Sequence, residues 1–163
     1  MGNYKFKLDN SCAIKGRHDL LIKFNNPYPE DLLIDKSLVG LEGDALKKAL
    51  NKPFFVAKDL IVTIEYKTDN YSFIIPQNYD WNGANVPLFC WYIIGQPKEP
   101  RFKLASCVHD YLCEHKKVIN NDRYLSTLVF ETLSEYFGRF NGFKRWAMFH
   151  SIDNYQKMQG WKK

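Results

Sequence analysis

YDWNGANVPLFCWYIIGQPKEPRFKLASCVHDYLCEH, residues 79–115, is the stretch around which this chain is organised. It begins with a turn rich in Asn, Asp and Gly, and continues with an almost wholly apolar aromatic run. It ends in a helical pattern that carries His109 and Asp110. Pro87 suits the first turn of a short helix over 88–94, because its missing N–H would have no partner there. No other stretch joins so much apolar surface to so many groups capable of chemistry.

Helical periodicity continues after this stretch. Apolar residues recur at intervals of three and four, which is typical of amphipathic helices. The predicted helices run from Pro100 to about His115, over about 122–137 and over about 141–158. The expected buried stripe of the last helix consists of Phe143, Ala147, His150 and Asn154.

The N-terminal half has the pattern of strands. Residues 60–66 and 71–75 flank a Lys-Thr-Asp-Asn turn and predict an antiparallel hairpin. Residues 1–30 are expected to form extended pieces, 31–50 a helix that contains two glycines, and 78–85 a loop. Strands followed by helices predict an α+β fold, in which a small antiparallel sheet or hairpin packs against three to four C-terminal helices.

Length and composition limit the class of protein. The 163 residues suit a single domain over 1–163, with enough chain to bury a core. The net charge of +5 is scattered and accompanies no nucleic-acid-binding motif, so nucleic acid is not an expected partner. The apolar run Val86–Ile94 is too short to span a membrane, and the first residues, MGNYKFKLDN, lack the apolar stretch of a secretory signal, so none is expected. The four cysteines contain no C-x-x-C pair and are expected to be reduced thiols.

Four short motifs follow one another along the chain. The turn 81–87 reads WNGANVP, the aromatic helix 88–95 reads LFCWYIIG, residues 109–112 read HDYL, and residues 123–130 read RYLSTLVF. In this order and spacing they resemble the DUF1353 family, a domain of unassigned function found mostly in phage and prophage genomes. The resemblance covers about residues 54–160 and leaves 1–53 as an N-terminal extension.

The resemblance also implies roles for single residues. The motif positions expected to hold structure are Ala84, Pro87, Arg123, Thr127 and Phe130. The family usually has carboxylates at positions 82 and 127 and a serine at position 85, where this chain has Asn82, Thr127 and Asn85. Of the three carboxylates in the family pattern, only Asp110 remains.

His109 and Asp110 are the strongest chemical signal. Adjacent helical residues point about 100° apart, so each is expected to serve a different neighbour. In an enzyme they would be the catalytic pair, with His109 as a general base or as a ligand of a divalent metal. In a purely structural role they would hold the loop over 79–85 by hydrogen bonds. The missing carboxylates favour the structural role, and no cofactor or metal is expected.

Three other chemistries have less support. Cys113 lies four residues after His109, but such a pair supplies only two of the three or four ligands that zinc requires. Phosphohydrolases with a His-Asp pair also need an upstream helical histidine, and His18 lies in an extended stretch. A Cys–His nucleophile could use Cys90 or Cys113, although the apolar surroundings of Cys90 would make it inert.

Trp81 lies in a polar loop and has two possible roles. With Asn82 and Asn85 it is expected to form an exposed binding surface, because Trp is common among interface hot spots. The alternative is that Trp81 folds back and caps the core beneath the hairpin.

These patterns lead to an expected function. It is that of a phage- or prophage-encoded structural or accessory protein, a virion or tail component that contacts other proteins and has no catalytic activity. One alternative is a small metal-dependent hydrolase that uses His109 and Asp110, and another is a host-directed inhibitor or binding module. The expected location is the host bacterial cytoplasm during synthesis and then the virion, without membrane attachment.

Overall fold

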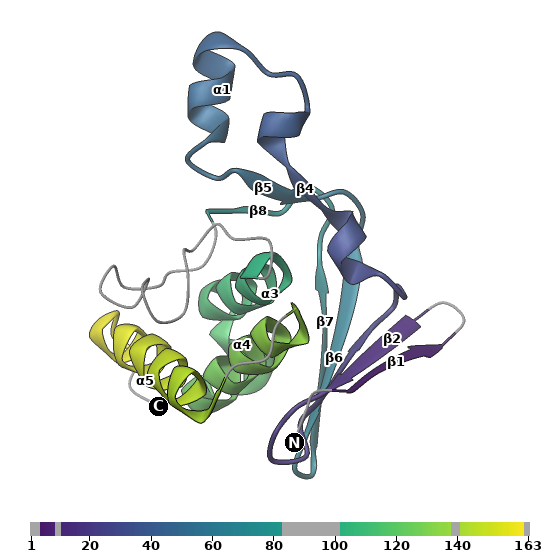
Figure 1. The fold of residues 1–163 in the computed structure, drawn as a ribbon, viewed down its shortest axis with the longest axis vertical. Coiled ribbons are helices and arrows are strands. Elements are labelled where there is room, and N and C mark those ends of the chain that lie inside the picture. The colour runs from purple at the N-terminus through teal and green to yellow at the C-terminus, as the bar shows by residue number, and fades with distance from the viewer. Residues whose placement is uncertain (1–3, 9–10, 83–101, 138–140, 162–163) are drawn as a thin grey trace.

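The computed structural model describes residues 4–8, 11–82, 102–137 and 141–161 (Figure 1). Two antiparallel sheets occupy the N-terminal half and α-helices occupy the C-terminal half. Figure 1 shows the C-terminal helices grouped on one side of the larger sheet. The predicted α+β fold is therefore confirmed.

The larger sheet contains five strands and so extends well beyond the predicted hairpin. Its strands, in spatial order, are β1 (Tyr4–Leu8), β2 (Ser11–Lys15), β3 (Leu21–Phe24), β6 (Leu60–Tyr66) and β7 (Asp69–Ile75). The register places Ile14, Ile22 and Ile64 side by side across β2, β3 and β6. All three are fully buried and belong to the core. Alternate residues of a strand point to the same face of the sheet, and these three side chains lie on the face that the core covers.

The smaller sheet corrects two expectations. It contains β4 (Leu33–Asp35), β5 (Phe54–Val56) and β8 (Asp80–Trp81). The helix expected over 31–50 is wrong for most of its length. The segment instead contains β4, the short helix α1 (Gly43–Ala49) and two 3-10 helices, which are η1 (Pro29–Leu32) and η2 (Lys36–Leu38). Gly40 and Gly43 have positive φ angles of 75° and 61°, which interrupt a right-handed helix. The loop expected over 78–85 is wrong at β8.

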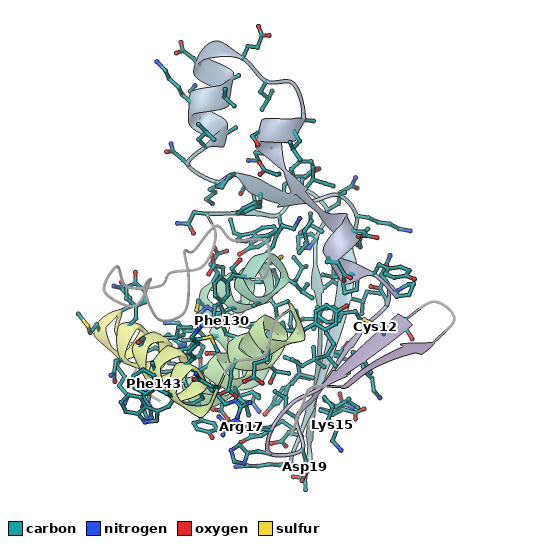
Figure 2. The ribbon with its side chains drawn as sticks, in the orientation of Figure 1. Cys12, Lys15, Arg17, Asp19, Phe130 and Phe143 are labelled. Carbon is teal, nitrogen blue, oxygen red and sulfur yellow. The ribbon has the colours of Figure 1, made fainter. Side chains whose placement is uncertain are left out.

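The helices after residue 102 match the sequence prediction in extent. They are α3 (Lys103–Glu114), the 3-10 helix η5 (Lys116–Ile119), α4 (Arg123–Phe137) and α5 (Gly142–Met158). The predicted buried stripe of α5 is wrong except at Ala147, because Phe143, His150 and Asn154 are exposed. Figure 2 places Phe143 on the outside of α5, and its ring stacks on that of Trp146 at 6.2 Å. The short helix expected over 88–94 lies outside the described residues.

Two expectations about the whole chain have a partial answer. Within the described ranges, no helix is long and apolar enough to cross a membrane. Cys107 and Cys113 are free thiols, whereas Cys90 lies outside the described residues.

Candidate functional site

Helix α3 separates two pockets that share Cys113. The first, which we call the His109 pocket, has a volume of about 210 Å³ and is lined by His109, Cys113, Lys116, Ile152, Tyr155, Gln156, Gln159 and Trp161. The second, which we call the Asp110 pocket, has a volume of about 220 Å³ and is lined by Lys52, Trp81, Asn82, Asp110, Cys113 and Glu114. Because neighbouring helical residues point in different directions, His109 and Asp110 line different pockets.

His109 is almost completely buried between α3, α4 and α5. Its Nδ1 lies 3.8 Å from Oδ1 of Asp110, which is an ion-pair distance and is longer than a hydrogen bond. Its Nε2 lies 3.1 Å from Nε2 of Gln156, and its ring packs edge-on against Phe130 at 5.3 Å. Phe130 is buried and lies in the helical layer in Figure 2. The nearest hydrogen-bond partner of His109 is therefore the Gln156 amide, not the adjacent carboxylate.

Gln156 connects His109 to the hydroxyl groups of α4. Its Oε1 accepts hydrogen bonds from Oγ of Ser126 at 2.9 Å and from Oγ1 of Thr127 at 3.2 Å. Its Nε2 lies 3.1 Å and 3.2 Å from the same two oxygens. Both hydroxyls can also donate to the carbonyl oxygen of Arg123, so either orientation of the Gln156 amide can be satisfied. In one orientation the Gln156 amide donates an N–H to a neutral His109, and in the other its oxygen accepts from a protonated His109. The network can therefore hold either form of His109.

The sulfur of Cys113 lies over the face of the His109 ring. Sγ is 3.7 Å from Nδ1 and 3.8 Å from Nε2. A sulfur lying in the ring plane at these two nearly equal distances would collide with Cε1. A nitrogen accepts a proton along its in-plane lone pair, so His109 cannot deprotonate Cys113 in this arrangement. The geometry argues against a Cys–His nucleophile.

The ionisable groups of α3 have shifted pKa values. Burial lowers the pKa of His109, but the negative charge that Cys113 and Asp110 can carry outweighs it and raises that pKa from its ordinary value to about 10. Burial raises the pKa of Asp110, against the opposing effects of His109 and Lys52. Burial therefore disfavours the charged form of both His109 and Asp110, and the interaction between the two side chains favours it.

Metal binding was the alternative role for this pair. Among the residues that the structure describes, no group of three or more His, Cys, Asp or Glu side chains could hold a metal ion. Asn82 lines the Asp110 pocket together with Asp110 and Glu114. Thr127 lies on α4, where its Oγ1 contacts Gln156, and it is absent from the lining of both pockets.

The expectation that Trp81 is exposed is wrong. Trp81 retains only 2% of its accessible surface, and its Nε1 donates a hydrogen bond of 2.9 Å to Oγ of Ser106 on α3. The ring packs against Phe54 and Tyr79, with centroid distances of 5.5 Å and 6.2 Å. Pairing of β8 with β5 turns the side chain inwards, so Trp81 caps the core, which was the alternative considered for it.

The other motif residues are distributed around this core. Arg123 donates from Nε to Oδ1 of Asp153 at 2.8 Å and from Nη1 to the carbonyl oxygen of Trp161 at 2.9 Å. It thereby ties the start of α4 to α5 and to the C-terminal segment. The remaining motif positions, Ala84, Asn85 and Pro87, lie outside the described residues.

Sequence reasoning missed Gln156. It belongs to no recognisable motif, and it lies 47 residues from its partner His109. One available signal was that Phe149, Ile152 and Gln156 recur at helical spacing, which places a polar residue on an otherwise apolar face.

Comparison with known proteins places the chain in a family. Residues 58–152 match the family described as a protein of unknown function, DUF1353. The chain belongs to the DUF1353 family. The resemblance to this family is thus confirmed, and the matched residues, 58–152, fall within the expected region of about 54–160.

One relative of this DUF1353 chain is an uncharacterized protein, y4jT, of Sinorhizobium fredii (strain NBRC 101917 / NGR234). It is 31% identical over 113 residues, which cover 62% of this chain and 31% of the relative. The chain therefore matches less than a third of that protein's length. No solved structure matches the chain.

Replacing His109 by alanine is expected to lower the free energy of unfolding by about 1–3 kcal/mol at neutral pH, because the Gln156 amide loses a buried partner. A folded-state pKa of about 10, above the ordinary 6.5, means that the ionic contribution is fully present below pH 6.5 and is lost as the pH rises towards 10. The difference between wild type and variant should therefore shrink over that range in urea denaturation. The exposed His150→Ala is the matched control. A fully stable His109→Ala protein that has lost a measurable activity would contradict the structural role.

Proposed function

We propose that this DUF1353 protein is phage- or prophage-encoded and acts by contact with a protein partner, as a structural or accessory component of the virion or its tail, rather than by catalysis. The single observation that carries the proposal is an apolar projection on the smaller sheet. We call it the apical arm and define it as residues 36–50, which include η2 and α1. Figure 1 shows this arm standing away from the helices and the larger sheet.

The apical arm carries a concentration of exposed apolar side chains. Leu38 is 83% exposed and Leu50 46% exposed, and Val39 and Leu41 are exposed as well. Single exposed leucines are ordinary on a protein surface, but a group of them on a small projection is typical of an interaction site. Burial of such a group in a partner would supply the hydrophobic contribution to binding.

The interior of the helical layer also supports a contact function. Ser126 and Thr127 both hydrogen-bond Gln156, which contacts His109, and Arg123 is held by Asp153. These polar groups are engaged in holding α4 and α5 together. The hydrolase alternative therefore depends on His109 and Asp110 alone, while a host-directed binding module would use the same apical arm with a different partner.

The test changes the arm without changing the core. Leu38→Ser combined with Leu50→Ser should leave the melting temperature within a few degrees of the wild type, since both side chains are exposed. Ile74→Ser is the matched control, because Ile74 is 50% exposed on β7, outside the arm. Tagged proteins are expressed in the bacterium that carries the gene, and the tag is quantified in purified phage particles.

Wild type and Ile74→Ser are expected in the particles, and the double variant is expected to be depleted at least about tenfold, the effect of about 1.4 kcal/mol of binding free energy. Wild-type protein that is absent from the particles contradicts the virion role. A double variant that is incorporated like the wild type contradicts the role of the arm.

A further inference from the structure

The His109 pocket has the size of a single aromatic ring with one substituent. Its volume is about 210 Å³. An engineered apolar cavity of about 150 Å³ in another protein binds benzene, so the space here admits a six-membered ring and one small group in addition. Ligand pockets of drug-sized molecules are larger, at about 300–1,000 Å³, which limits the occupant to a small molecule.

One wall of the pocket is a fixed aromatic surface. The Trp161 indole is buried, and its Nε1 donates a hydrogen bond of 2.8 Å to the carbonyl oxygen of Asn121. The backbone carbonyl of Trp161 is also bound by Arg123, so the residue is held at both ends. Ile152 adds a buried aliphatic surface to the same pocket. The part of the Trp161 ring that lines the pocket, together with Ile152, would form the apolar contact with a flat ligand.

The polar lining of this pocket is basic or neutral. Lys116 extends over the Trp161 ring, with Nζ 5.0 Å from the ring centroid, and His109 contributes a second group that can carry a positive charge. No carboxylate is among the described lining residues. The acid Asp153 is already bound by Arg123 at 2.8 Å and by Lys157 at 3.1 Å, so it is not available to Lys116. A negative charge in the ligand would complement this lining.

Neutral hydrogen-bond donors surround the same space. Tyr155 and Gln159 line the pocket near the end of α5 and offer a phenol and an amide. A carboxylate accepts up to four hydrogen bonds in one plane, and it forms stronger hydrogen bonds with a charged donor than with a neutral one. The side chains of this pocket therefore combine a stacking surface with a set of donors for one small planar anion.

We propose that the His109 pocket binds a small aromatic carboxylate of the size of benzoate, with its ring against Trp161 and its carboxylate at Lys116, Tyr155 and Gln159. This binding site goes beyond the proposed contact function and does not involve the apical arm.

Benzoate, its neutral isostere benzamide and inorganic phosphate are the three probes. Isothermal titration calorimetry measures affinity, and a ¹H–¹⁵N spectrum follows the indole N–H of Trp161. Benzoate is expected to bind saturably with a Kd below about 1 mM and to shift the Trp161 signal, while benzamide binds at least about tenfold more weakly because it lacks the charge. Phosphate is expected not to compete, because it has no ring to stack.

Lys116→Met should weaken benzoate binding at least about tenfold and leave the melting temperature nearly unchanged, because Lys116 is only partly buried. The neighbouring Lys117 is exposed and does not line the pocket, so Lys117→Met is the matched control with wild-type affinity. Equal affinity for benzoate and benzamide, phosphate binding in place of benzoate, or wild-type affinity of Lys116→Met would each overturn the proposal. Absence of benzoate binding up to several millimolar would overturn it as well.

Discussion

Replacing Trp81 by alanine is expected to lower the free energy of unfolding by about 3–5 kcal/mol, the range for removing a large buried aromatic side chain. Trp81 is among the largest fully buried side chains, and it fills the space between the smaller sheet and α3. Alanine would leave a cavity beside Phe54 and Tyr79 and would remove the donor to Ser106. β8 (Asp80–Trp81) is otherwise held by its pairing with β5 and by the ion pairs of Asp80 with Lys36 and Lys52.

Two further variants separate packing from hydrogen bonding at this position. Trp81→Phe keeps most of the apolar volume and loses the N–H, so it should cost less than Trp81→Ala. Trp146→Ala is the matched control, since Trp146 is 59% exposed and its removal should change stability by no more than about 0.5 kcal/mol. All free energies are measured by urea denaturation. A Trp81→Ala protein of wild-type stability that has lost a partner would instead support the contact role expected from the sequence.

The parts of the fold that depend on local pattern could be predicted from the sequence. The apolar spacing in α3 and α4 is a property of each segment, and the predicted extents agree with the structure to within a few residues. The hairpin of β6 and β7 is also local, because its two strands are joined by a turn of two residues.

The parts that depend on distant pairing could not be predicted. β3 joins the hairpin through Ile22 and Ile64, which are far apart in the chain, so nothing near either residue indicates a five-stranded sheet. Trp81 was misjudged for the same reason. Its neighbours Asp80 and Asn82 are polar and typical of a loop, whereas its burial follows from the pairing of β8 with β5.

The candidate site shows the same division. His109 and Asp110 could be singled out from their position on a predicted helix, and their different directions follow from helical geometry. The hydrogen-bond partner of His109 could not, because Gln156 comes from another helix. The hydrogen bond of 3.2 Å between Thr127 and Gln156 could not be predicted for the same reason.

Replacing Arg17 by methionine is expected to lower the free energy of unfolding by about 3–5 kcal/mol, because it leaves a buried carboxylate without its partner. Arg17 lies in the turn between β2 and β3, at the foot of the larger sheet in Figure 2. Its Nε and Nη2 donate to the two oxygens of Glu131 at 2.9 Å and 2.7 Å. Glu131 is on α4 and only 1% exposed, so this pair joins the helical layer to the sheet.

The pH dependence of the Arg17→Met protein identifies the cause. Burial raises the pKa of Glu131, and Arg17 opposes that rise, so the variant should have a still higher folded-state pKa. A folded-state pKa above the unfolded value gives stability that is fully present at pH values below the unfolded pKa and is lost as the pH rises through the folded one. The stability gap between Arg17→Met and wild type should therefore narrow on acidification from pH 7 to pH 5.

Adding Glu131→Gln should recover part of the loss at pH 7, because no buried charge then remains. Lys23→Met is the control, because it breaks the exposed pair with Glu65 and should cost no more than about 1 kcal/mol. A loss below about 1 kcal/mol for Arg17→Met, or a gap that does not change with pH, would show that the buried pair does not hold α4 to the sheet.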